Sequence, residues 1–144
     1  MNAKAEKFVE MTKENNITCF TVTELPDELE TVVFRSTMEI DGQQLPVAVL
    51  IDKSIFVVVR TVILQKLPDK AGVQDSVEKY AAAANGNFKV FKYYLKENNF
   101  ILDMCLPATD SSFDPDMVRA LLDLAIKHLQ EKYRELMRIV WSGD

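Results

Sequence analysis

Residues 31–64 read TVVFRSTMEI DGQQLPVAVL IDKSIFVVVR TVIL, and this stretch predicts three consecutive strands. It is rich in the β-branched and aromatic residues that favour strands. Asp41-Gly42 predicts a hairpin turn, and Asp52-Lys53-Ser54 predicts a second turn. Because short turns join antiparallel neighbours, we expect the three strands to lie side by side.

The last of these strands, residues 55–64, is apolar almost without interruption. A strand with one face exposed to water would alternate apolar and polar residues. The continuous run therefore predicts a central strand that is covered on both faces, or that has one face covered by a partner chain.

Further strands are expected on both sides of this region. Residues 17–23 are β-branched and aromatic, which predicts a strand before it. Residues 88–95 and 100–106 predict a second hairpin around the polar turn 96–99, and Pro107 closes it.

Three helices complete the expected fold. The first spans residues 3–15. The second follows Leu67-Pro68-Asp69 and ends at Asn85-Gly86, where glycine allows the left-handed stop. The third starts at Asp114-Pro115 and continues to the end of the chain for about seven turns, or roughly 40 Å. A helix of this length lies diagonally across the sheet or projects past it.

The expected order is therefore α-β-β-β-β-α-β-β-α. Runs of antiparallel hairpins with helices on one side predict an α+β fold with a twisted antiparallel sheet. The 144 residues suit a single domain, residues 1–144.

Composition and charge exclude several classes of protein. The chain is 48% hydrophobic and 27% charged, which excludes disordered and collagen-like proteins. Its net charge of -5 argues against nucleic acid or an anionic membrane surface as the main partner. The first residues form no apolar signal segment, and the charges of Asp52, Lys53 and Arg60 offset the apolar gain of inserting residues 45–64 into a membrane. We expect a cytoplasmic protein with no membrane partner.

Side chains that could carry out chemistry are few. His128 is the only histidine, and we expect it to be a surface or half-buried helix residue, because acid–base and metal sites need partners at defined spacing. Cys19 and Cys105 predict buried thiols, with a disulfide or a reactive thiol as alternatives. An enzyme that uses carboxylates such as Asp103 or Asp110 is the least favoured function. We expect no catalytic residue, no cofactor and no metal.

The middle helix carries the candidate surface for a dimer or a partner. Its apolar members recur at helical spacing and are Val73, Val77, Tyr80, Ala81 and Ala84. Together with the apolar strand 55–64 and the long last helix, this stripe offers more apolar surface than a two-layer monomer easily covers, which favours a homodimer. The alternative is that the stripe packs on the chain's own sheet, and an Ala81→Arg variant would separate the two.

From Asp75 onward the chain resembles the YbjN family, bacterial proteins described as sensory transduction regulators. The similarity lies in a helix that ends at Asn85, an aromatic strand over 88–95, a polar turn, a strand over 100–106 that is closed by Pro107, and an amphipathic C-terminal helix. No catalytic residue follows from this resemblance.

The resemblance implies a fold similar to that of type III secretion chaperones, which are small, acidic, cytoplasmic homodimers that hold a partner segment in extended form. We therefore expect a non-enzymatic protein-binding module, chaperone-like or regulatory. It would capture a segment of a partner protein by strand addition at a sheet edge, or in a groove beside a helix. The alternative is a small-molecule sensor with an apolar pocket between the sheet and the C-terminal helix.

Overall fold

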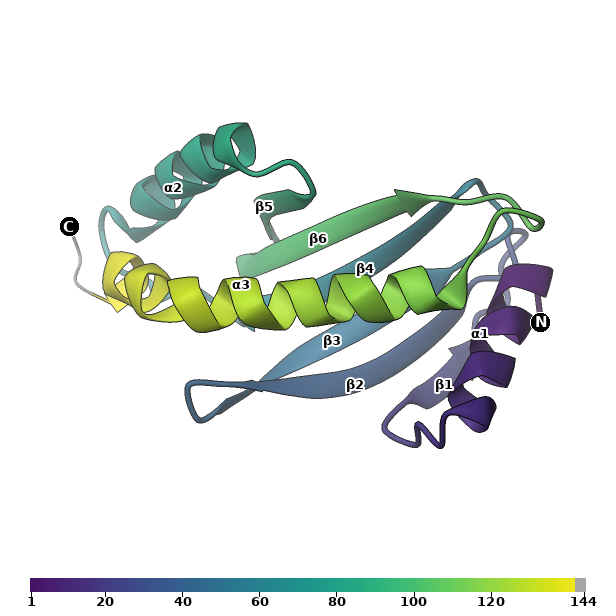
Figure 1. The fold of residues 1–144 in the computed structure, drawn as a ribbon. Helices are drawn as coiled ribbons and strands as arrows, with labels where there is room; N and C mark the ends of the chain where they lie inside the picture. The colour runs from purple at the N-terminus through teal and green to yellow at the C-terminus, as the bar shows by residue number, and fades with distance from the viewer. Residues whose placement is uncertain (142–144) are drawn as a thin grey trace.

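Three helices and six strands follow one another in the expected order in the computed structural model, which describes residues 1–141 (Figure 1). The helices are α1 (Ala3–Glu14), α2 (Val73–Asn87) and α3 (Pro115–Trp141). The strands are β1 (Thr21–Glu24), β2 (Val32–Ile40), β3 (Gln43–Ile51), β4 (Phe56–Leu64), β5 (Phe91–Lys96) and β6 (Asn99–Pro107). The predicted α+β class is confirmed.

The six strands form one antiparallel sheet in the order β1-β2-β3-β4-β6-β5. The hairpin between β2 and β3 turns at Asp41 and Gly42, whose φ angles of 50° and 79° are the two positive values that a tight hairpin turn needs. β6 pairs with β4, which makes β4 an inner strand and leaves β5 and β1 at the two edges.

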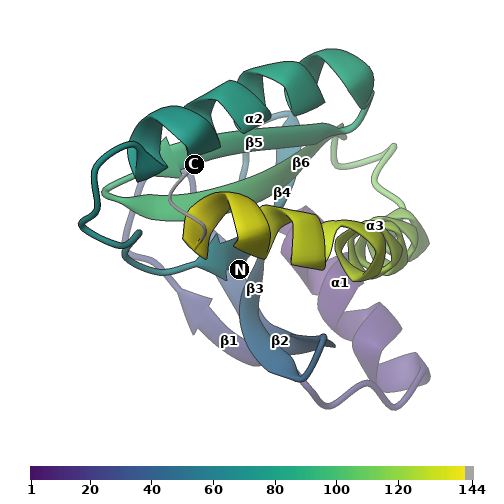
Figure 2. The same ribbon diagram turned by 90° about the vertical axis from the view of Figure 1, so that its left-hand side faces the viewer.

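The helices cover one face of this twisted sheet (Figure 2). α3 contacts β2 and β4, α1 contacts α3, and α2 lies along β5 and also contacts α3. Side chains from all three helices and from the covered face form one continuous hydrophobic core. Within residues 1–141, no helix or strand covers the opposite face of the sheet.

Strand β4 illustrates the difference between the two faces. Val57, Val59 and Ile63 point into the core and are buried, whereas the alternate residues Val58 and Val62 are half-buried. The chain itself therefore covers β4 on one face only. Cover of the second face by a partner chain stays a prediction.

A buried lysine fixes α1 to the sheet. The side chain of Lys4 is 0% exposed, and its Nζ donates to the backbone carbonyl oxygens of Ser54, Phe56 and Ala108. These carbonyls belong to the turn before β4, to β4 itself and to the loop after β6. Lys4 thus ties three segments of the chain to one helix.

Three elements differ from expectation in their bounds. α2 continues through Gly86 to Asn87, because Gly86 does not adopt the left-handed backbone that would have stopped it. β5 then begins at Phe91, three residues later than the expected start at Phe88. The strand expected over residues 17–23 is reduced to the four residues of β1.

Both cysteine side chains are exposed and unpaired, so the prediction of buried thiols is wrong. Cys105 lies on β6, where the side chain of Met104 points into the core and that of Cys105 points to the uncovered face. Cys19 precedes β1. The error arises because an apolar strand run was taken to be buried on both of its faces.

Candidate functional site

The uncovered face of the sheet is the candidate functional site, and we name it the open face. Alternate residues of β2, β3, β4, β6 and β5 build it, and strand register aligns them in rows across the sheet. The central row is Arg35, Ala48, Arg60, Asp103 and Lys92. Three cationic side chains and one carboxylate thus share a single row.

Apolar rows flank the central row on both sides. One row is Val33, Leu50, Val58 and Cys105, and on the other side Val62, Ile101 and Tyr94 are in register. Val33 and Ile101 are buried by their neighbours, whereas Leu50, Val58 and Val62 remain half-buried. At the start of β4 the side chain of Phe56 is 46% exposed. The open face is therefore a basic strip between apolar borders.

An ion-pair network holds the centre of this strip. The Arg60 guanidinium meets the Asp103 carboxylate through two bonds, Nε to Oδ1 at 2.9 Å and Nη2 to Oδ2 at 3.0 Å. The Tyr94 hydroxyl donates to the same Oδ2 at 2.8 Å. This paired geometry is the strong form of a carboxylate contact.

The network also decides the charges at neutral pH. The hydrogen bond to Asp103 raises the pKa of Arg60, which stays cationic. Burial, and then the hydrogen bond to Asp103, raise the pKa of Tyr94 to about 12, so its hydroxyl stays protonated. Asp103 is thus compensated by Arg60.

Two cations of the central row lack a carboxylate partner among the described residues. Arg35 is exposed, and its Nη1 donates to the Thr23 hydroxyl at 3.1 Å. Lys92 is exposed, and its Nζ lies 5.5 Å from the centre of the Tyr94 ring. Since Asp103 compensates Arg60, the row keeps the two positive charges of Arg35 and Lys92, on a chain whose net charge is -5.

A hollow of about 510 Å³ opens at the end of the open face next to β5. Its lining residues are Val58, Lys89, Val90, Lys92, Asp103 and Cys105. The loop before β5 therefore adds a further lysine to the border of the basic strip.

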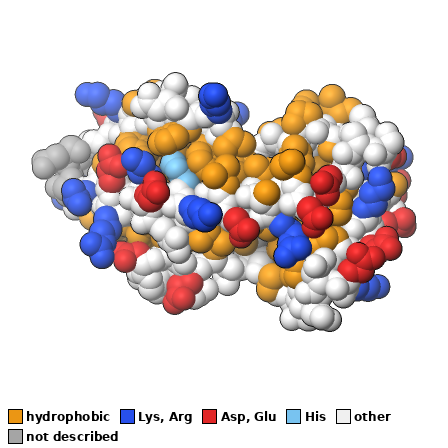
Figure 3. Space-filling model, viewed as in Figure 1, with side chains coloured by type: hydrophobic (Ala, Val, Ile, Leu, Met, Phe, Trp, Pro, Cys, Tyr) orange, Lys and Arg blue, Asp and Glu red, His pale blue; other side chains and the backbone are white. Residues whose placement is uncertain are grey.

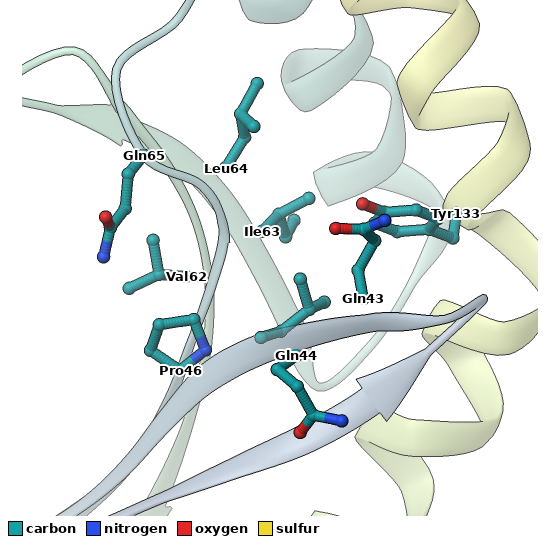
Figure 4. Close-up of a pocket in the computed structure, with 9 residues that line it drawn as sticks. Gln43, Gln44, Pro46, Val62, Ile63, Leu64, Gln65 and Tyr133 are labelled. Carbon is teal, nitrogen blue, oxygen red and sulfur yellow. The ribbon is translucent and has the colours of Figure 1, made fainter.

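A second hollow lies where β3 and β4 separate (Figure 4). The pairing between these strands ends at Val47 and Thr61, and Pro46, which has no N–H to donate, lies just beyond. The hollow measures about 250 Å³, and Gln43, Gln44, Gln65 and Tyr133 are among its lining residues. Tyr133 belongs to α3, so this hollow lies between the sheet and the C-terminal helix, where the small-molecule alternative expects a pocket. At about 250 Å³ this hollow is smaller than typical ligand pockets, which hold roughly 300–1,000 Å³.

The stripe that the sequence singled out lies mainly inside the chain. Val73, Val77, Ala81 and Ala84 are buried in the core, as the intramolecular alternative expects. Tyr80 is half-buried and meets the Tyr93 ring edge-on at 5.6 Å. Of the five residues, only the partly exposed side of Tyr80 is open to a partner.

Asn85 was expected only as the end of a helix. In the structure, its side chain binds the backbone in the middle of the edge strand β5. Its Nδ2 donates to the Tyr93 carbonyl oxygen at 3.0 Å, and the Tyr93 N–H donates to its Oδ1 at 2.7 Å. These are backbone groups of β5 that would otherwise be open to an added strand. An added strand at β5 would have to displace these two bonds.

His128 is 7% exposed, so its expected surface or half-buried place is wrong. Its Nε2 lies 2.5 Å from the Tyr93 hydroxyl, and its ring stacks on Phe91 with 4.0 Å between centres. Burial lowers the pKa of His128, which favours the neutral ring that this packing needs. These contacts join α3 to β5, and helix periodicity alone cannot predict which strand the helix meets.

The two carboxylates considered for catalysis have different environments. Asp103 is held by Arg60, and Asp110 is exposed in the loop before α3. Within residues 1–141, no three His, Cys, Asp or Glu side chains are grouped as metal ligands. None of the helices described has the length and apolar character needed to span a membrane.

Comparison of the chain with protein-family models, with curated proteins and with solved structures finds no match. The resemblance to the YbjN family and the chaperone-like character of the fold therefore stay predictions.

Proposed function

We propose that this protein is a non-enzymatic protein-binding module, chaperone-like or regulatory, that captures a segment of a partner protein on its open face. One observation carries the proposal. Strand β4 is apolar except at Arg60 and Thr61, yet the chain covers only one of its two faces. A strand that needed cover on one face only would carry polar residues at Val58 and Val62.

The apolar borders of the open face supply the binding free energy in this proposal. Burial of apolar surface contributes roughly 25 cal/mol per Å², and contiguous exposed apolar surface commonly marks an interaction site. Phe56, at 46% exposure, is the largest open side chain of β4 and extends this surface at one end. The basic strip between the borders would fix the orientation of the segment.

We place the homodimer contact on the helix side of the molecule. A two-fold contact between two open faces would bring like charges together, since each face presents Arg35 and Lys92. On the helix side, charges of both signs are mixed with hydrophobic side chains (Figure 3). There, α3 exposes Met117 at 45% and Leu124 at 42%.

Light scattering after size exclusion, with native mass spectrometry on the same fraction, tests the dimer. We expect a mass near twice 16.4 kDa, and a monomer for the Leu124→Lys variant. A monomeric parent protein contradicts the dimer. A bound small molecule in the native spectrum would instead favour the sensor alternative.

Site-specific photo-crosslinking in cells tests capture on the open face. A photoreactive phenylalanine analogue replaces Phe56 in one variant, and replaces Met117, which is similarly exposed on the helix side, in the matched control. We expect discrete crosslinked partner proteins from position 56, and only the dimer from position 117. Partner proteins crosslinked from position 117 alone, or from neither position, contradict the proposal.

A further inference from the structure

We infer that the segment captured on the open face is acidic, with carboxylate side chains over the central row and apolar side chains over the flanking rows. This inference rests on the proposed function and adds the chemical class of the partner.

The first step is the imbalance of charge in the central row. Arg60 gives two N–H donors to Asp103 out of the five that a guanidinium carries. Arg35 and Lys92 have no carboxylate partner in the part of the chain that the structure describes. The row therefore has unused donors and positive charge along its length, and carboxylates are the groups that complement both.

The second step is the geometry of the row. Arg35, Arg60 and Lys92 lie on β2, β4 and β5, and their strands are separated by β3 and β6. At about 4.8 Å between neighbouring strands, the cations span roughly 19 Å. A segment that crosses the strands meets all three in turn. The apolar rows lie two residues away along each strand, or roughly 6.7 Å, which is within reach of leucine-sized side chains on the same segment.

The third step is the exclusion of other occupants. A second open face would repel this one, because both are basic. A nucleic acid would find the Asp103 carboxylate in the middle of the row and a net charge of -5 on the chain around it. The Tyr94 ring, the aromatic side chain in the flanking row, is already engaged by Lys92 and by the bond to Asp103. An acidic protein segment meets the same carboxylate and the same net charge, but it also brings apolar side chains for the flanking rows, which a phosphate backbone lacks.

Fluorescence anisotropy with labelled peptides tests the inference. Three short peptides rich in leucine are compared, one with glutamate, one with glutamine and one with lysine at the same positions. A single-stranded oligouridylate serves as a fourth probe. The parent protein is compared with Arg35→Gln/Lys92→Gln, which removes the two unpaired cations, and with Lys79→Gln/Lys127→Gln. The control pair makes the same change of charge at exposed positions of α2 and α3.

We expect the parent to prefer the glutamate peptide, and expect Arg35→Gln/Lys92→Gln to weaken its binding by about 3- to 20-fold, as the loss of two exposed charge pairs implies. The control pair should change binding by less than about 2-fold. Added salt should selectively weaken the binding of the glutamate peptide, because the Debye length falls from about 10 Å at 0.1 M to about 3 Å at 1 M.

Equal binding of the three peptides, or no binding of any of them, overturns the inference. Tighter binding of the oligouridylate overturns it as well. Crosslinking from position 56 tests the proposed function separately. If a partner is captured there but the glutamate peptide is not preferred, only the inference is refuted.

Discussion

Replacing Lys4 by methionine should destabilise the protein by about 2–4 kcal/mol. The change keeps the apolar stem of a side chain that is 0% exposed and removes its ammonium group. The contact to Ser54 is short, that to Ala108 is 3.2 Å, and that to Phe56 is long at 3.5 Å. Hydrogen bonds to a charged group contribute about 1.5–3 kcal/mol each, so two good bonds give roughly 3–6 kcal/mol. Relief from burying a charge offsets part of this loss.

Urea denaturation followed by circular dichroism measures the effect. With a urea dependence of about 2 kcal/mol per M, the midpoint should fall by roughly 1–2 M. Lys7→Met is the matched control, because Lys7 lies one turn later on α1 and, among the described residues, donates to the Asp110 carbonyl oxygen at the surface. We expect that control to cost less than about 1 kcal/mol. Equal midpoints for the two variants would refute the reasoning, since the buried ammonium of Lys4 would then contribute no more than that of the half-buried Lys7.

Three further outcomes are expected. Ala81→Arg should unfold the protein rather than separate a dimer, because Ala81 is 7% exposed and lies in the core. Circular dichroism and light scattering that show a folded, monomeric variant would contradict this. As pH falls below about 6.5, the unfolded chain protonates His128 while burial lowers the pKa of the ring in the folded chain, so stability should fall by up to about 1.4 kcal/mol per pH unit. His128→Gln should remove that part of the pH dependence of urea unfolding, and an unchanged dependence would argue against a buried neutral ring. Cys19 and Cys105 should both react with a thiol reagent in the folded protein, Cys105 more slowly because burial raises its pKa, whereas reaction only in urea would contradict their exposure.

The element order was predictable because local signals carry it. Asp41-Gly42 has the backbone that its turn requires, and the apolar period of α3 holds from Val118 to Val140. Helix ends were less certain, since Gly86 accepts a helical backbone as readily as a left-handed one.

The candidate site could not be predicted in the same way. The central row exists only because β4 pairs with β6 at a register that places Arg60 opposite Asp103. Sequence periodicity gives the alternation along one strand and contains no information about which strand lies next to it. The same reason explains His128 and Lys4, whose partners Tyr93 and Ala108 are distant in the chain.

The Asn85 side chain on β5 limits how many copies of this protein could join edge to edge. A chain of sheets that grows without end needs two open edges on every molecule, one to accept and one to offer. With its hydrogen bonds to Tyr93, Asn85 occupies the backbone at the middle of one edge and leaves the four-residue β1 as the other. Growth through β5 would have to break both Asn85 bonds to Tyr93, which favours joining through β1 and therefore pairs over fibres.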